Sequence, residues 1–246
     1  MNSNPTKITP DRIKSAIVEL KYSSKLPFDV IIGLFYKVLD DSYTYTNRPT
    51  QQIKVDDSQE LVFGIQHIFF NDKIHLHLQP GALVFNGIQK DDNSTGYKYI
   101  GWDNYLPEIY KILSEIKDQD ILESYLRIGI RYNSEYPDID IRTSTKFSFT
   151  FGLPDITSKK FSFSSEFMFD DHRIILQLLN KNSSSDPSII QPTSAIDIDI
   201  IKDNLNISKN DFENLIPYIV SAHDLEKQIF FKLLQPDFIN TLKPIY

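Results

Sequence analysis

The residues best suited to chemistry are two arginines in the stretch LRIGIRY, which begins at position 126. Side chains alternate along a strand, so Arg127 and Arg131 share one face, and Gly129 leaves the space between them open. A guanidinium is a planar fork of donors that fits phosphate or carboxylate. In one interpretation these arginines and Lys21 bind an anion. In the other, which we favour, Glu19 of another strand forms a structural ion pair with Arg127.

Two histidines raise the question of a metal site. His75 and His77 lie two residues apart, so a strand presents both imidazoles on one face, where they could share a metal ion. A third ligand would have to come from elsewhere, such as Asp72 or His67. The chain has no cysteine, which removes thiolate ligands. A half-exposed strand explains the pattern, so we predict neither a metal site nor a cofactor.

Other polar patterns give no catalytic set. Asp197 and Asp199 share a strand face and could hold Mg²⁺, yet alternation in a half-exposed strand explains them. His223 is close in sequence to Glu226 and Lys227, but no serine or cysteine lies in a glycine-flanked nucleophile turn. The chain has eight glycines and no phosphate-binding loop of the common kinds. We therefore predict no catalytic residues.

The last predicted helix, 209–234, is apolar around much of its circumference. Most of that surface is expected to lie in the core, but apolar area that stays exposed usually marks an interface. We predict that Phe230, Phe231 and Leu234 form a surface for a protein partner, in a hetero-complex or a homo-oligomer.

The elements that position these residues follow from periodicity. A helix that begins at Pro27 and another over 102–116 show apolar steps of three and four, and Pro217 is expected to kink the last helix. Strands are predicted at 17–22, 61–70, 73–78, 82–88, 126–133, 146–151, 160–169, 172–179 and 195–200. Short links between strands predict an α+β fold of mainly antiparallel sheet, or a partly open barrel, with three principal helices. We expect one compact unit over 1–246, or two sub-domains, 1–135 and 136–246. We also expect the Trp102 indole to be largely buried.

Five short motifs resemble the TIGR04255 family of sporadically distributed bacterial proteins. They lie in the family's order along nearly the whole chain and cover Ala16–Leu20, Tyr97–Tyr105, Arg127–Asn133, Ala195–Ile200, and Ala222-His223 with Phe230-Phe231. The family is known mainly by its patchy distribution, which is typical of genes for defence or conflict. The resemblance therefore implies a binding or regulatory role in such a system, together with a protein partner.

A second comparison supplies the alternative function. Triphosphate-tunnel enzymes of the CYTH group carry a Glu-x-Glu-x-Lys strand and arginine-bearing strands. This chain has Glu19-Leu20-Lys21, but Ile17 stands where the first, metal-binding glutamate belongs. The alternative is thus a phosphate- or nucleotide-binding protein, or a CYTH-like triphosphate tunnel enzyme.

Composition limits the class of protein. The chain has 246 residues and 41% hydrophobic residues, which is enough for a substantial core. A net charge of −7 argues against a general nucleic-acid binder. The first residues show no signal-peptide pattern, and no apolar run approaches the roughly 20 residues of a membrane span. We expect a cytoplasmic, non-enzymatic protein, with an enzymatic role as the less favoured alternative.

Overall fold

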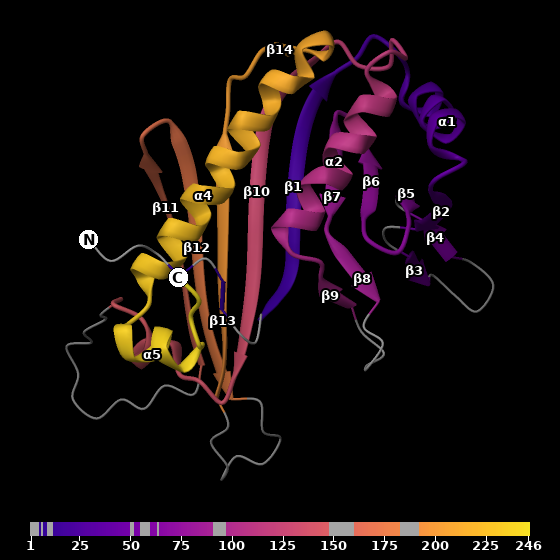
Figure 1. Ribbon diagram of the computed structural model, residues 1–246. Coiled ribbons are helices and arrows are strands. Elements are labelled where there is room, and N and C mark those ends of the chain that lie inside the picture. Colours follow the sequence, from indigo (N-terminus) through magenta and orange to yellow (C-terminus); the bar gives the residue numbers. More distant parts are fainter. Residues whose placement is uncertain are drawn as a thin grey trace. The chain divides into compact units, whose positions relative to one another are not determined.

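The fold is α+β, with a large antiparallel sheet that is not closed (Figure 1). The computed structural model describes residues 5, 7–8, 12–49, 52–54, 60–62, 64–90, 97–147, 160–182 and 192–246. Within these residues, three α-helices are longer than six residues, which confirms the predicted fold class and its three principal helices.

The chain divides into two compact units. The first unit is Met1–Ser15, Ile130–Ile201 and Val220–Tyr246, and the second unit is Ala16–Gly129 and Lys202–Ile219. Two long strands, β1 (Ile13–Ser23) and β10 (Ser124–Pro137), contribute residues to both. Each unit is assembled from separated stretches of chain, so no single cut along the sequence divides them.

In the second unit, neighbouring strands follow the order β10-β1-β7-β6-β5-β2, with β14 also paired to β10. Two further antiparallel pairs are β3 with β4 and β8 with β9. The elements are α1 (Phe28–Leu39), β2 (Thr44–Pro49), β3 (Gln52–Lys54), β4 (Glu60–Val62), β5 (Ile65–Phe70), β6 (His75–Gln79), β7 (Ala82–Asn86), β8 (Ile88–Lys90), β9 (Tyr97–Tyr99), α2 (Trp102–Ile116), β14 (Ile207–Ser208) and the 3-10 helix η1 (Lys209–Leu215).

Helix α2 is fixed to the strands of the second unit by one tyrosine. Its apolar stripe is buried and comprises Tyr105, Ile109, Ile112, Leu113 and Ile116. The Tyr105 hydroxyl donates to the Phe85 carbonyl at 2.7 Å and accepts from the Val18 amide at 3.1 Å. A Cβ at Gly87 would lie 2.6 Å from the Tyr105 ring, so glycine lets the ring approach the backbone. The helix therefore contacts β7 and β1 in one register.

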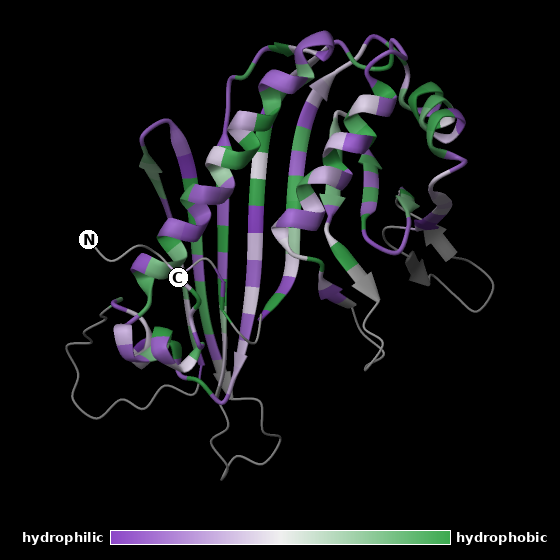
Figure 2. Cartoon of the chain, viewed as in Figure 1, coloured by the Kyte–Doolittle hydropathy of each residue, from purple (hydrophilic) through white to green (hydrophobic). Residues whose placement is uncertain are grey.

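In the first unit, the strand order is β11-β12-β13-β10. The elements are α3 (Ile141–Ser144), β11 (Lys160–Phe169), β12 (His172–Asn182), β13 (Pro192–Lys202), α4 (Ile216–Leu233, from Val220 onward) and α5 (Pro236–Thr241). Figure 2 shows apolar and polar residues alternating along β10. The centroid of the Tyr132 ring lies 5.7 Å from the centroid of the His223 ring, so α4 packs against the face of β10 that carries Tyr132.

Several predicted boundaries differ in the structure. The last helix begins as η1 and has non-helical backbone at Asp211, ahead of the expected kink at Pro217. The strand predicted to end at Asn133 continues to Pro137 as β10. Short helices α3 and α5 have no counterpart among the predicted elements, and Trp102 is half-buried. Residues 148–151 of the strand predicted at 146–151 lie outside the described residues.

Candidate functional site

Arg127 and Glu19 meet in the second unit. Nη2 of Arg127 donates to Oε1 of Glu19 at 2.7 Å, and Nζ of Lys21 lies 3.7 Å from Oε2 of the same carboxylate. Nε of Arg127 is 4.0 Å from Asp203. The two cations thus face two carboxylates, and the side chains of Arg127 and Glu19 are only 30% and 23% exposed.

Arg131 has a separate partner within the first unit. Its Nε and Nη2 donate to the two oxygens of Asp197 at 2.8 and 2.7 Å, which is bidentate pairing. Asn133 Nδ2 adds a third donor at 3.2 Å, and the Asp197 side chain is 11% exposed. The hydrogen bond to Asp197 raises the pKa of Arg131. The sequence placed Asp197 beside Asp199 on a strand, but it did not indicate that Asp197 pairs with Arg131.

The histidines of β6 show no metal-binding arrangement. Burial lowers the pKa of both His75 and His77, and the positive charge of Arg48 lowers both pKa values further. His67 instead shares a hydrogen bond of 2.7 Å with the Tyr45 hydroxyl. Across the described part of the chain, no three histidine or acidic side chains come close enough together to hold a metal ion.

Helix α4 carries a buried acid among its apolar residues. Glu226 is 7% exposed, and burial raises its pKa to about 8. Burial lowers the pKa of the nearby His223 to about 4. Glu226 lies four residues after Ala222 and four before Phe230, so its carboxyl belongs to the buried stripe of the helix. This spacing was the signal in the sequence that could have indicated a buried carboxyl group.

The predicted partner surface on the last helix requires correction. Phe230, Phe231 and Leu234 are 9%, 6% and 0% exposed, so they belong to the core rather than to an open surface. The chain after α3 covers this end of the helix, where the Lys146 amide donates to the Leu233 carbonyl at 2.8 Å. The broad apolar coverage of the helix is therefore used inside the first unit.

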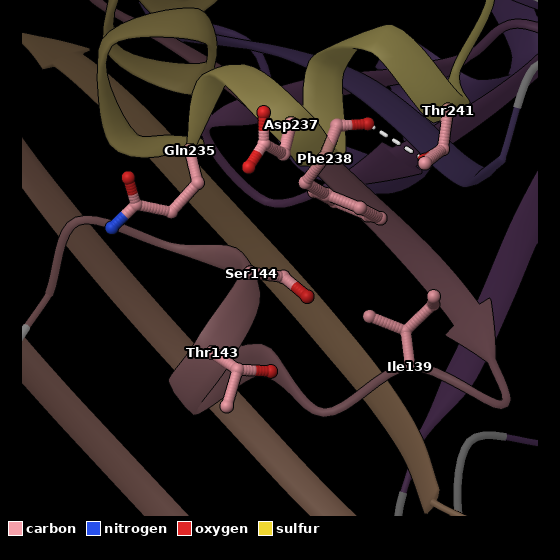
Figure 3. A pocket seen from close by; sticks show the side chains of 7 residues that line it. All are labelled: Ile139, Thr143, Ser144, Gln235, Asp237, Phe238 and Thr241. Carbon is pink, nitrogen blue, oxygen red and sulfur yellow. Dashed lines mark hydrogen bonds between the residues drawn. The ribbon is translucent and has the colours of Figure 1, made fainter.

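A cavity of about 420 Å³ lies between α3 and α5 in the first unit (Figure 3). Its lining residues are Ile139, Thr143, Ser144, Gln235, Asp237, Phe238 and Thr241. Three of the polar side chains are engaged with backbone carbonyls: Thr143 with Asp140 at 3.1 Å, Thr241 with Phe238 at 2.7 Å, and Gln235 with Thr145 at 3.0 Å. These bonds fix the rim of the cavity.

Two polar groups of the lining remain for a ligand. Within the described residues, neither the Ser144 hydroxyl nor the Asp237 carboxylate makes a hydrogen bond or ion pair through its side chain. Figure 3 shows the Phe238 ring above Ile139 in this view, with the Ser144 hydroxyl to the left of both side chains. Among the lining residues that the structure describes, Asp237 is the one ionisable group, so the cavity offers apolar walls, a hydroxyl and a negative charge. Neither group was singled out in the sequence, because α3 and α5 are too short to show a periodic pattern.

Comparisons with known proteins add no relative, since no family model and no curated protein matches this sequence. The resemblance to the TIGR04255 family therefore stays a prediction. In the portion of the chain that is described, no helix has the length and apolar character needed to cross a membrane.

Proposed function

We propose that this protein is a non-enzymatic binding or regulatory protein that acts with a protein partner in the bacterial cytoplasm. The observation that carries the proposal is the cavity between α3 and α5, whose described lining residues include one ionisable group and no imidazole or amine beside the one serine and two threonines. A serine without such a base is a poor nucleophile but a good hydrogen-bonding group. The setting in a defence or conflict system is proposed from the family resemblance alone.

The chemistry of the cavity fits a basic side chain of the partner. A lysine or arginine has an apolar stem that can lie against Phe238 and Ile139 and a cationic end that can reach Asp237 or Ser144. The net charge of −7 favours encounter with a basic surface. A lysine- or arginine-bearing segment is thus the part of the partner that we propose enters the cavity.

The pairing of the two sheet arginines, Arg127 and Arg131, also favours a non-enzymatic binding protein over an anion-binding enzyme. Arg127 faces Glu19, and Arg131 is held by both oxygens of Asp197. A phosphate would have to displace a carboxylate that is already hydrogen-bonded and partly buried. A carboxylate of the same unit balances the positive charge of each arginine. This pairing favours a structural role for both arginines over anion binding.

The test of the cavity is affinity capture from the native host with three forms of the full chain. The wild type and Asp237→Asn are compared with Asp224→Asn, which removes an exposed carboxylate from α4 outside the cavity. We expect one partner to be retained by the wild type and by the control but lost with Asp237→Asn. Equal capture by all three forms would reject the cavity as the partner site.

The alternative function is tested by thermal unfolding with phosphate, tripolyphosphate and a nucleotide. Any ligand bound to the native state raises the melting temperature by mass action. We expect no rise for the wild type. A rise that disappears in both Arg127→Ala and Arg131→Ala, together with metal-dependent triphosphate hydrolysis, would replace the proposed function with the anion-binding one.

A further inference from the structure

The outer face of α1, in the second unit, leaves apolar side chains exposed. Val30 and Tyr36 are 46% and 45% exposed, although the opposite face of the helix is buried. The Tyr36 ring is held edge-on against the Tyr45 ring, with centroids 5.7 Å apart. An aromatic side chain that is both exposed and held in place is suited to a protein contact, because little side-chain freedom is lost on binding.

The glycine between these two residues is not required by the fold. Gly33 lies in the middle of α1, where glycine weakens a helix relative to alanine. Its φ is not in the left-handed region, and a Cβ at this position would meet no atom of the described chain within 4 Å. Neither a turn nor close packing inside the described chain therefore needs glycine here. A missing side chain on an exposed helix face instead lets a second backbone approach closely.

Two opposite charges lie at equal distances from this glycine. Asp29 is four residues before Gly33, Lys37 is four residues after it, and both side chains are exposed. Within the described residues, neither of these two side chains makes a hydrogen bond or ion pair. Steps of four keep both charges and the glycine on one face of the helix, and Val30 and Tyr36 lie three residues to either side of the glycine. The face therefore carries opposite charges at matching positions about its centre.

We propose that α1 packs antiparallel against α1 of a second copy of this chain, with a two-fold axis beside Gly33. Asp29 of each copy then lies at the level of Lys37 of the other, because the two residues are equally far from the axis. For the same reason, Val30 of each copy lies at the level of Tyr36 of the other. One surface thus meets itself with opposite charges at both ends of the contact.

The contact is small, so the dimer is expected to be weak. Twelve residues give a helix about 18 Å long, and one such helix covers less than the roughly 800 Å² that each partner buries in a standard interface. We therefore expect a reversible equilibrium that favours the dimer only as protein concentration rises. Because the paired charges are exposed, added salt should weaken the association.

Exchange of the two charges tests the register. Asp29→Lys places two lysines at one level of the contact, and Lys37→Asp places two aspartates there, so each single variant brings like charges together. The double variant exchanges the charges and restores opposite signs. By sedimentation velocity over a range of protein concentrations, we expect the wild type and the double variant to dimerise and each single variant to stay monomeric. Far-ultraviolet circular dichroism checks that every variant is folded.

A cross-linking experiment tests the position of the axis. The chain has no cysteine, so each variant carries one thiol. In Gly33→Cys, helices roughly 8–10 Å apart bring the two Cα atoms within the roughly 7 Å that a disulfide can span. In the control Asp40→Cys, at the end of the helix, the proposed arrangement holds the thiols roughly 20 Å apart. We expect mild oxidation of the full chain to give a covalent dimer with the first variant and none with the second.

Three results would overturn the dimer. The wild type could stay monomeric at every concentration, the folded double variant could fail to recover the dimer that the single variants lose, or the two cysteine variants could cross-link equally. If a charge variant does not fold, the cysteine pair decides the question alone. The proposal does not rest on the cavity, so Asp237→Asn should dimerise like the wild type.

Discussion

Glu226 makes the stability of the protein depend on pH in an unusual direction. Its pKa in the folded protein is about 8, against an ordinary value of 4.5, because burial in α4 disfavours the carboxylate. Between these two values the unfolded chain loses the proton while the folded chain keeps it. The folded state then binds more protons than the unfolded state, so the free energy of unfolding falls as pH rises.

The size of the effect follows from the two pKa values. A difference of about 3.5 in pKa corresponds to about 5 kcal/mol, at 1.36 kcal/mol for each pKa unit. Glutamine has a similar shape and cannot ionise. Glu226→Gln should therefore have nearly wild-type stability below pH 4.5 and exceed it by up to about 5 kcal/mol above pH 8.

His223 acts in the opposite direction at lower pH. Burial lowers its pKa from 6.5 to about 4, so the unfolded chain takes up a proton first as pH falls through this range. Stability is then lost below pH 6.5. This loss affects the wild type and Glu226→Gln alike, so it cancels when the two proteins are compared at each pH.

The assay is urea unfolding followed by far-ultraviolet circular dichroism at pH 5, 7 and 9. Asp224→Asn is the control, because it removes an exposed carboxylate from the same helix. A difference between wild type and Glu226→Gln that stays constant from pH 5 to 9 would refute the reasoning. It would mean that Glu226 is ionised in the folded protein across this pH range.

Four further substitutions, one of them a control, test the packing and one ion pair by melting temperature and urea midpoint. Gly87→Ala should be strongly destabilising because its Cβ would lie 2.6 Å from the Tyr105 ring, whereas Gly33→Ala has open space and should be neutral or stabilising. Tyr105→Phe removes two buried backbone hydrogen bonds and should cost about 1–3 kcal/mol; a change near zero would show that water replaces them. Asp197→Asn should cost about 1–3 kcal/mol because it leaves Arg131 without its bidentate acceptor, and an unchanged midpoint would contradict that role.

Local patterns in the sequence were enough to predict much of the fold but little of the candidate functional site. Strict alternation was enough to predict β10, and an apolar stripe with steps of three and four was enough to predict α2. The pairing of Arg131 with Asp197, 66 residues apart, depends on which strands become neighbours, and periodicity does not encode that choice. Glu226 was obscured because the apolar residues around it dominate the pattern of α4.

The division into units has a consequence for the order of synthesis. Ala16–Gly129, most of the second unit, leaves the ribosome as one continuous stretch. The first unit needs Val220–Tyr246 as well, and the backbone of Lys7 is bonded to that of Ile245 in both directions, at 3.3 and 2.8 Å. Closing so long a loop is slow. We expect the first unit to be completed only after Val220–Tyr246 has been synthesised, so that nascent chains wait with the apolar strands of β11 and β12 exposed and depend on chaperones during that interval.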